Sequence, residues 1–208
     1  MDLKEIYASL APEYERLVAR EDFAGNILKA LQEIRVLAGL EVVELGAGTG
    51  RLTCMLAPFV RSIRAFDASD HMLGVAREKL AAGNWQNWQA DVAVHAELPV
   101  ADATADLVIA GWSLVYSAIW AAGDWRIELG QTLAEMRRVL RPGGTIIALE
   151  TMGTGSTSPQ PPADLLDYLS FLKQAEFQTR WIRTDYRFKD MAEAQQAARA
   201  VAHLPICA

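Results

Sequence analysis

A short acidic and glycine-rich stretch, Glu44-Leu45-Gly46-Ala47-Gly48-Thr49-Gly50, is the part of the sequence best suited to bind a small molecule. Glycine lets the backbone bend sharply and approach a ligand closely. Dinucleotide-binding loops use the pattern G-x-G-x-x-G to hold a pyrophosphate, but here the third glycine comes one residue earlier. The carboxylate of Glu44 would repel a pyrophosphate and attract an ammonium group. The stretch therefore favours a ligand that carries an amino-acid-like cation.

Two aspartates further along the chain have the chemistry to hold a nucleoside. Asp67 follows the second predicted strand, where a carboxylate can accept hydrogen bonds from both hydroxyls of a ribose. Asp91 follows the third predicted strand and can accept a hydrogen bond from the amine of an adenine, with Met72 and Val92 as apolar walls. The predicted binding residues are Glu44, Gly46, Ala47, Gly48, Thr49, Gly50, Asp67, Ala68, Met72, Asp91, Val92, Gly111 and Trp112.

The sequence contains no unambiguous general base. The low-ranking candidates, chosen by residue type and by position near the predicted binding edge, are Tyr116, His71, Glu150 and Tyr14. Aromatic residues also cluster after the fourth predicted strand, at Trp112, Tyr116 and Trp120. They either pack in the core or form a wall that attracts a cation.

Each of these assignments has a structural alternative. The glycines could serve a tight turn in another α/β domain, and Asp91 could form a local turn through its side chain. Asp67 could simply stabilise the start of the next helix, where acidic residues are favourable. A nicotinamide-dependent dehydrogenase is disfavoured by the glycine spacing and by Glu44.

The elements that must position these residues alternate between strands and helices. Apolar runs predict strands at residues 41–45, 62–66, 85–90, 106–110 and 145–150, and helical periodicity predicts helices at 51–58, 71–82 and 125–140. Residues 141–144, Arg-Pro-Gly-Gly, predict a type II turn. This alternation indicates an α/β fold with a doubly wound, mostly parallel sheet and helices on both faces. Ligands of such sheets bind beyond the carboxyl ends of the strands, where the strand order reverses.

The two ends of the chain flank this core. We expect one domain, residues 1–208, with an N-terminal helical cap (1–37), a ligand-binding core (38–150) and a substrate-side and C-terminal segment (151–208). Within the last segment, periodicity predicts helices at 164–175 and 190–202 and a sixth strand near 181–188. Residues 203–208 are short and contain proline, so the last strand of the sheet is predicted to be missing. An exposed sheet edge would then favour pairing with another chain.

Composition excludes several other classes of protein. The chain has 208 residues, 51% hydrophobic content and a net charge of −6, which fits a globular domain and gives no basic surface for nucleic acid. No apolar run is long enough to span a membrane, and the first residues do not resemble a signal peptide. Two distant cysteines and three scattered histidines predict neither a disulfide framework nor a metal site. These features predict a cytoplasmic protein.

The ordered motifs resemble those of class I (Rossmann-like) S-adenosylmethionine-dependent methyltransferases of the methyltransferase-11 or methyltransferase-25 type. The resemblance covers residues 38–150 and rests on segments 44–50, 67–73, 98–108 and 140–145. It implies that Glu44 and the glycines hold the methionine part of S-adenosylmethionine, Asp67 the ribose and Asp91 the adenine. This chain departs from the family at Ala105, where an aromatic residue is common, and in its missing last strand.

The resemblance implies methyl transfer to a small-molecule acceptor by in-line displacement, in a monomer or homodimer. The acceptor atom, whether oxygen, nitrogen, carbon or sulfur, stays open. The alternative is a catalytically inactive protein that binds S-adenosylmethionine or S-adenosylhomocysteine as a regulatory or partner subunit. The acidic residues that favour binding do not distinguish these two functions.

Overall fold

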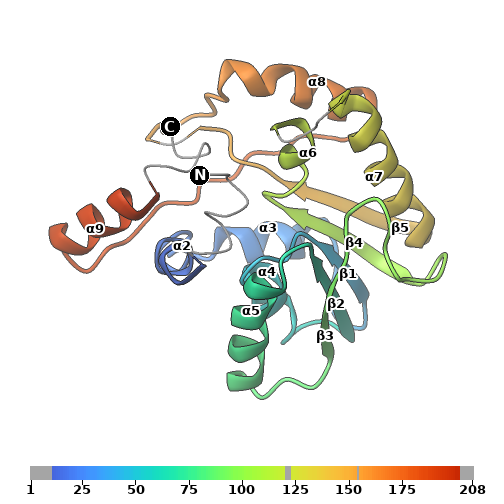
Figure 1. Ribbon diagram of the computed structural model, residues 1–208, viewed down its shortest axis with the longest axis horizontal. Coiled ribbons are helices and arrows are strands. Elements are labelled where there is room, and N and C mark those ends of the chain that lie inside the picture. The colour runs from blue at the N-terminus through green and yellow to red at the C-terminus, as the bar shows by residue number, and fades with distance from the viewer. Residues whose placement is uncertain (1–10, 120–122, 154, 202–208) are drawn as a thin grey trace.

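Five parallel strands form the centre of the computed structural model, which describes residues 11–119, 123–153 and 155–201 (Figure 1). They are β1 (Glu41–Leu45), β2 (Ser62–Asp67), β3 (Trp88–Val92), β4 (Ala105–Gly111) and β5 (Leu140–Leu149). Their order in the sheet is β3-β2-β1-β4-β5, and every neighbouring pair is parallel. The strand order therefore reverses between β1 and β4, and ligands of open α/β sheets bind at such a point.

Helices cover both faces of this sheet, as the sequence predicts. They are α2 (Ala11–Val18), α3 (Asn26–Ile34), α4 (Arg51–Leu56), α5 (Asp70–Ala82), α6 (Val115–Ile119), α7 (Trp125–Val139), η1 (Ala163–Leu165), α8 (Leu166–Gln174) and α9 (Met191–Val201). Alternate residues of a strand point to opposite faces. Val42 packs with α3 and α4 on one face, whereas Val43 packs with α7 and α8 on the other.

Side-chain caps fix where several helices begin. The Asp22 carboxylate accepts hydrogen bonds from the backbone N–H groups of Asn26 and Ile27, at 2.8 and 2.9 Å, at the start of α3. Ser69 caps α5 by accepting from Met72, and Asp124 caps α7 in the same manner. Such caps satisfy donors that the first turn of a helix leaves unpaired. Two of them, at α3 and α5, therefore set the direction of helices that lie beside the binding edge.

Two strands, β3 and β5, differ from the sequence prediction by three residues or more at one end. β3 begins and ends later than predicted, so Asp91 and Val92 lie within the strand, paired with Phe66 and Asp67 of β2. β5 begins at Leu140, and its register with β4 is irregular before Thr145. The predicted turn falls inside this irregular part, where Gly143 has the positive φ of 77° that a type II turn requires.

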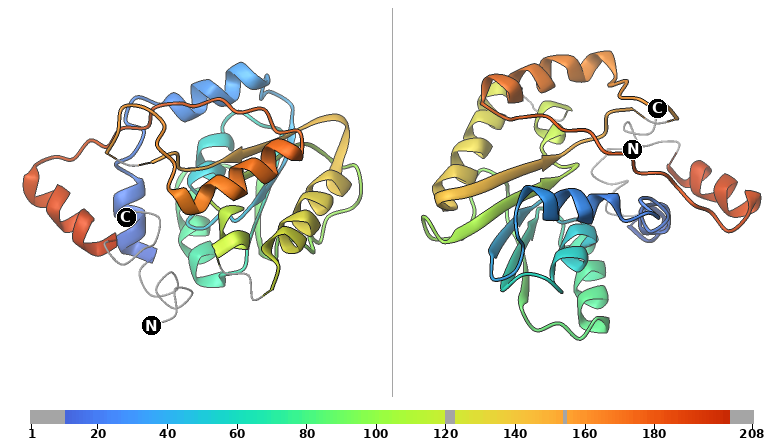
Figure 2. Two further views of the ribbon diagram at one scale, coloured as in Figure 1. Left: turned by 90° about the horizontal axis from the view of Figure 1, so that it is seen from above. Right: turned by 180° about the vertical axis from the view of Figure 1, so that it is seen from behind.

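The predicted sixth strand is wrong. The segment after α8 runs as an extended trace to α9 without joining the sheet (Figures 1 and 2). Its one bridge in the described chain pairs Tyr186 with Glu21, next to α2, and Ile182 packs onto the helical face that contains α3. Alternating side chains show that a segment is extended and half-buried, but they do not identify its partner. The prediction that the last strand is missing concerns residues 203–208, which lie outside the described residues.

Polar contacts tie this C-terminal segment to the N-terminal helices. Thr184 donates a hydrogen bond to Glu21 at 2.8 Å, and Arg20 pairs with Glu193. The backbone N–H of Arg187 donates to the Arg20 carbonyl at 2.9 Å. α2 and α9 lie side by side in both views of Figure 2. The N-terminal cap and the C-terminal segment therefore form one layer at the open end of the sheet.

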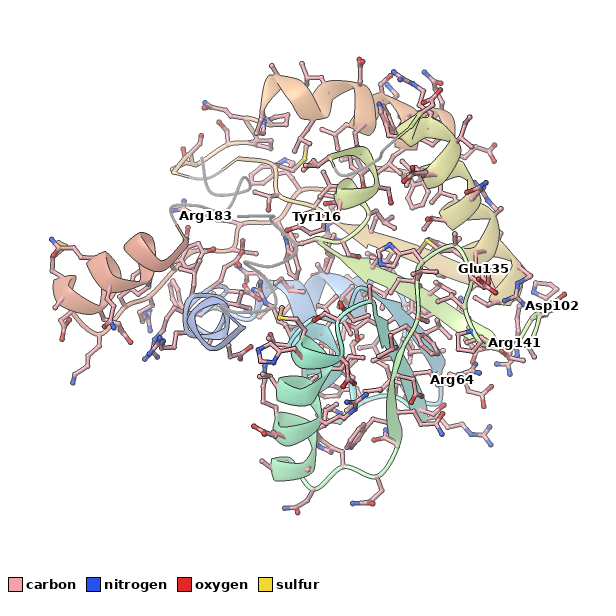
Figure 3. The ribbon with its side chains drawn as sticks, in the orientation of Figure 1. Arg64, Asp102, Tyr116, Glu135, Arg141 and Arg183 are labelled. Carbon is pink, nitrogen blue, oxygen red and sulfur yellow. The ribbon has the colours of Figure 1, made fainter. Side chains whose placement is uncertain are left out.

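Ion pairs gather at the opposite end of the sheet. Arg141 bonds to Glu41 and Asp106, and Arg138 bonds to Glu135 and Asp102. Figure 3 shows Asp102, Glu135 and Arg141 together, away from Tyr116. These pairs lie where β1 and β4 begin, so they serve the architecture and not the binding edge.

Candidate active site

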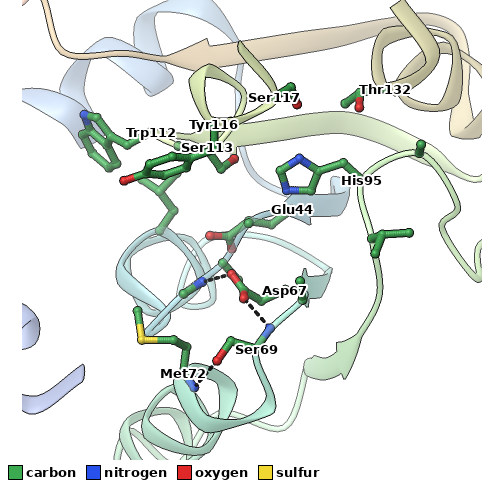
Figure 4. Close-up of a pocket in the computed structure, with 18 of the residues that line it drawn as sticks. Glu44, Asp67, Ser69, Met72, His95, Trp112, Ser113, Tyr116, Ser117 and Thr132 are labelled. Atoms are coloured by element: carbon green, nitrogen blue, oxygen red, sulfur yellow. Dashed lines mark hydrogen bonds between the residues drawn. The ribbon is translucent and has the colours of Figure 1, made fainter. Parts of the chain in front are cut away.

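A pocket of about 850 Å³ opens at the carboxyl ends of β1, β2 and β4. Its size is within the range typical of small-molecule sites. Of the residues predicted to bind the cofactor, those that line it are Glu44, Gly46, Ala47, Gly48, Thr49, Asp67, Ala68, Met72, Gly111 and Trp112. The structure therefore gathers most of the predicted set around one cavity (Figure 4).

The glycine loop depends on backbone shapes that other residues rarely adopt. Gly46, Gly48 and Gly50 have φ angles of 65°, 53° and 78°. A Cβ atom on Gly46 would lie 2.2 Å from the Cβ of Ser113, so β4 and the loop could not approach as they do. A Cβ on Gly50 would lie 2.8 Å from that of Ala76. Gly50 thus packs α4 against α5 and does not line the pocket.

Asp67 shapes this loop as well as lining the pocket. Its Oδ2 accepts a hydrogen bond from the Gly48 N–H and its Oδ1 accepts one from the Ser69 N–H, both at 2.8 Å (Figure 4). A carboxylate oxygen has further lone pairs, so these bonds leave Asp67 able to accept from a ligand. The aspartate thus joins the first two strand-to-helix connections, and its role in ribose binding stays a prediction.

Glu44 is a buried acid at the base of the pocket, with 2% of its surface exposed. Burial raises its pKa to about 8, because a charged carboxylate loses its hydration there. The charge of Asp67 acts in the same direction, while a 2.7 Å hydrogen bond from the Thr53 hydroxyl opposes the shift. A cationic ligand group beside Glu44 would stabilise its ionised form.

Two of the three predicted adenine contacts lie outside the lining, whereas Met72 is part of it. Asp91 and Val92 are exposed, and neither faces the pocket. The connection that follows β3 lines the pocket instead, through Val94, His95 and Ala96. It is held by a bridge between Val94 and Glu97. The role of Asp91 in adenine binding stays a prediction.

His95 is a lining residue that sequence reasoning missed. Its ring lies between the Glu44 and Thr132 side chains in Figure 4, close enough that its Nε2 would be 3.1 Å from a Cβ on Gly46. Burial lowers its pKa, and the charge of Asp67 only partly opposes this. The imidazole is therefore neutral at pH 7 and able to accept a proton.

An aromatic and cationic wall closes the side of the pocket next to the cap. Trp112 follows β4 with a positive φ of 52°. The Arg51 guanidinium lies over its ring, 4.4 Å from the centroid, and donates to Glu21 at 2.7 Å. Tyr116 of α6 lines the same side. The predicted aromatic wall is thus present at Trp112 and Tyr116, while Trp120 lies outside the described residues.

Two of the remaining predicted bases, Glu150 and His71, do not line the pocket. Glu150 lies just after β5, where it accepts hydrogen bonds from the Tyr168 hydroxyl and the Val115 N–H. Burial raises its pKa to about 7. His71 is exposed on α5. Tyr14 belongs to α2, but its side chain lies outside the described residues.

Polar residues of α6 and α7 complete the pocket. They are Ser117 of α6 and Glu128, Gln131 and Thr132 of α7, and Ser113 of the connection between β4 and α6 lines the same pocket. No sequence signal identified the four helical residues, because the pattern of a helix shows only which side faces the core. They extend the pocket beyond the glycine loop, on the side of β4.

The doubly wound sheet with its pocket at the point of strand reversal defines a Rossmann-like, ligand-binding fold. Residues 43–148, about half of the chain, match the family described as a methyltransferase domain. The chain therefore belongs to this family, and the predicted family and fold class are confirmed. The cofactor of this class is S-adenosylmethionine.

Relatives and solved structures agree with this assignment. A malonyl-[acyl-carrier protein] O-methyltransferase from Pectobacterium atrosepticum is 31% identical over 75% of this chain and 55% of its own length. A demethylmenaquinone methyltransferase from Listeria monocytogenes is 26% identical over 71% of this chain and 61% of its own. The chain thus spans little more than half the length of these relatives.

A crystal structure of an S-adenosylmethionine-dependent methyltransferase from Aquifex aeolicus has the same fold. The TM-score is 0.58 at 18% identity, over 84% of this chain and 88% of that one. In the part of this chain that the structure describes, no helix is long and apolar enough to cross a membrane. No cluster of three potential metal ligands occurs among the same residues.

Proposed function

We propose that this chain transfers the methyl group of S-adenosylmethionine to a small-molecule acceptor. The observation that carries the proposal is a single pocket that joins the glycine loop to a second, polar region on α6 and α7. The first region suits the cofactor and the second leaves room for another molecule. A cofactor-binding protein without catalysis would not need the second region.

The described residues fit the cofactor. Glu44 is a buried carboxylate for which no ion pair is found among the described residues, and this supports a role in binding the methionine ammonium. Asp67 retains acceptor capacity for the ribose, and Met72 provides an apolar wall. When bound, the cofactor supplies an electrophilic methyl group on a sulfonium.

The protein contributes alignment, exclusion of water and a place for one proton. An in-line displacement gains most from holding the two reactants in position. Ser113 follows β4 and Tyr116 lies on α6, and both line the pocket where they would hold the acceptor. His95 is the one histidine among the described residues that line the pocket, and we propose that it accepts the proton of a hydroxyl or amine acceptor.

The test combines binding with turnover. Calorimetry should show binding of S-adenosylhomocysteine and none of NAD. A panel of acceptors, including the malonyl-[acyl-carrier protein] and demethylmenaquinone that the relatives' names specify, is then assayed by release of S-adenosylhomocysteine. Binding of NAD in place of S-adenosylhomocysteine would refute the cofactor assignment. Binding without turnover on any acceptor would favour the non-catalytic alternative.

A further inference from the structure

Arg51 is the first residue of α4 and follows the glycine loop directly. It is the only arginine or lysine among the described residues that line the pocket, which also presents the carboxylates of Glu44, Asp67 and Glu128. The cavity is therefore acidic, with one fixed cation on its cap side. A ligand that matches this pattern carries positive charge and one anionic group.

The guanidinium of Arg51 has a fixed position, but one of its nitrogen atoms lacks a hydrogen-bond acceptor. Nη1 donates to the Oε2 of Glu21 at 2.7 Å, and the planar group lies against the ring of Trp112. Only 15% of the side chain is exposed. Nη2 is buried and has no hydrogen-bond partner among the described residues. Buried donors are almost always paired, so an orphan donor in a pocket indicates a missing acceptor.

Glu21 positions this guanidinium from the cap. Its second oxygen, Oε1, accepts a hydrogen bond from the Thr184 hydroxyl at 2.8 Å, and its backbone pairs with Tyr186. The acid is thereby fixed by the C-terminal segment. Because Glu21 occupies one side of the guanidinium and Trp112 covers its face, the free donor is restricted to the remaining edge.

We propose that Arg51 binds the carboxylate of the cofactor's methionine part through this free edge. The planar fork of a guanidinium matches a carboxylate in geometry and charge. Glu44 would then take the ammonium on the floor of the pocket and Arg51 the carboxylate on its cap side. This inference rests on the cofactor assignment above and adds a residue that reads the amino-acid end of the cofactor.

A ligand pair tests the inference without knowledge of the acceptor. S-adenosylhomocysteine carries the amino-acid group, and 5′-methylthioadenosine lacks it. Calorimetry measures both affinities in the wild type, Arg51→Gln and Arg51→Lys. We expect Arg51→Gln to lose roughly ten- to hundredfold in affinity for S-adenosylhomocysteine, the usual range for a charge-assisted hydrogen bond. Affinity for 5′-methylthioadenosine should be unchanged.

Arg126 provides a matched control outside the pocket. Its guanidinium also lies 4.4 Å from a tryptophan centroid, that of Trp125, and pairs with Asp167. Arg126→Gln should bind both ligands as the wild type does. Arg51→Lys keeps the charge and the stem, so it should fold and lose affinity for S-adenosylhomocysteine alone, by a smaller factor.

The outcomes separate the two levels of the proposal. Equal losses for both ligands, or no loss for either, would mean that Arg51 only braces the cap, and the inference would be overturned. A wild type that binds neither ligand would instead refute the proposed function. A selective loss for S-adenosylhomocysteine in either Arg51 variant supports the inference.

Discussion

Affinity for S-adenosylhomocysteine should rise with pH, because Glu44 must lose a proton before it can pair with an ammonium group. Burial raises the pKa of this carboxyl to about 8 in the ligand-free pocket. At that pKa, about one Glu44 in ten is ionised at pH 7 and about one in a hundred at pH 6. Linkage then predicts a roughly tenfold gain in affinity from pH 6 to pH 7 and a smaller gain from pH 7 to pH 8.

Calorimetric titration at pH 6, 7 and 8, in buffers of different protonation enthalpy, measures both the affinity and the protons released. At pH 7 the wild type should release about one proton for each ligand bound. Glu44→Gln should bind more weakly, release none and show no pH dependence. His95→Gln is the control and should retain the wild-type profile, because burial places the pKa of His95 below its usual value.

Equal affinities at pH 6 and pH 8 would refute this reasoning. So would a Glu44→Gln variant that keeps the wild-type pH dependence, because another group would then carry the proton. A pH dependence lost in His95→Gln but kept in Glu44→Gln would move the proton to the imidazole.

Three further changes test other parts of the structure. Asp67→Ala should weaken S-adenosylhomocysteine binding at least about tenfold, because it removes a charged acceptor; an unchanged calorimetric affinity would exclude Asp67 from the site. Gly46→Ala should lower stability by roughly 1–3 kcal/mol in urea denaturation, because its Cβ would meet Ser113; a wild-type midpoint would contradict the close approach. Burial raises the pKa of Glu150 to about 7 in the folded state. The free energy of unfolding of the wild type should therefore fall by up to about 3 kcal/mol as pH rises from 4.5 to 7. Glu150→Gln should flatten this decline. If the free energy of unfolding from urea denaturation falls equally with pH in both proteins, Glu150 is not the group that titrates.

The parts of the site that sequence predicted are those that local rules determine. The spacing of Gly46, Gly48 and Gly50 requires positive φ angles, and an acid after the second strand lies beside the loop because parallel strands end at one edge. In both cases the residues involved are only a few positions apart along the chain or lie on two paired strands. The sheet and its helices followed from periodicity for the same reason.

The parts of the site that the sequence did not predict depend on where a strand ends or on which distant segment packs against it. β3 extends two residues further than its apolar run, and this places Asp91 in the strand and brings His95 to the pocket. Tyr186 bonds to Glu21 rather than to β5, a choice between distant partners that alternation does not encode. Arg51 was visible as the residue after the loop, but its free donor is defined only by Glu21 and Trp112.

The joining of the C-terminal segment to the cap gives the protein an order of assembly. The five strands found in the described residues all precede residue 150, so the sheet can form while later parts of the chain are still on the ribosome. Thr184 and Glu193 reach Glu21 and Arg20 only after that stage. A segment synthesised after the five strands thus secures the acid that holds Arg51, so the pocket depends on contacts that form later than the sheet can.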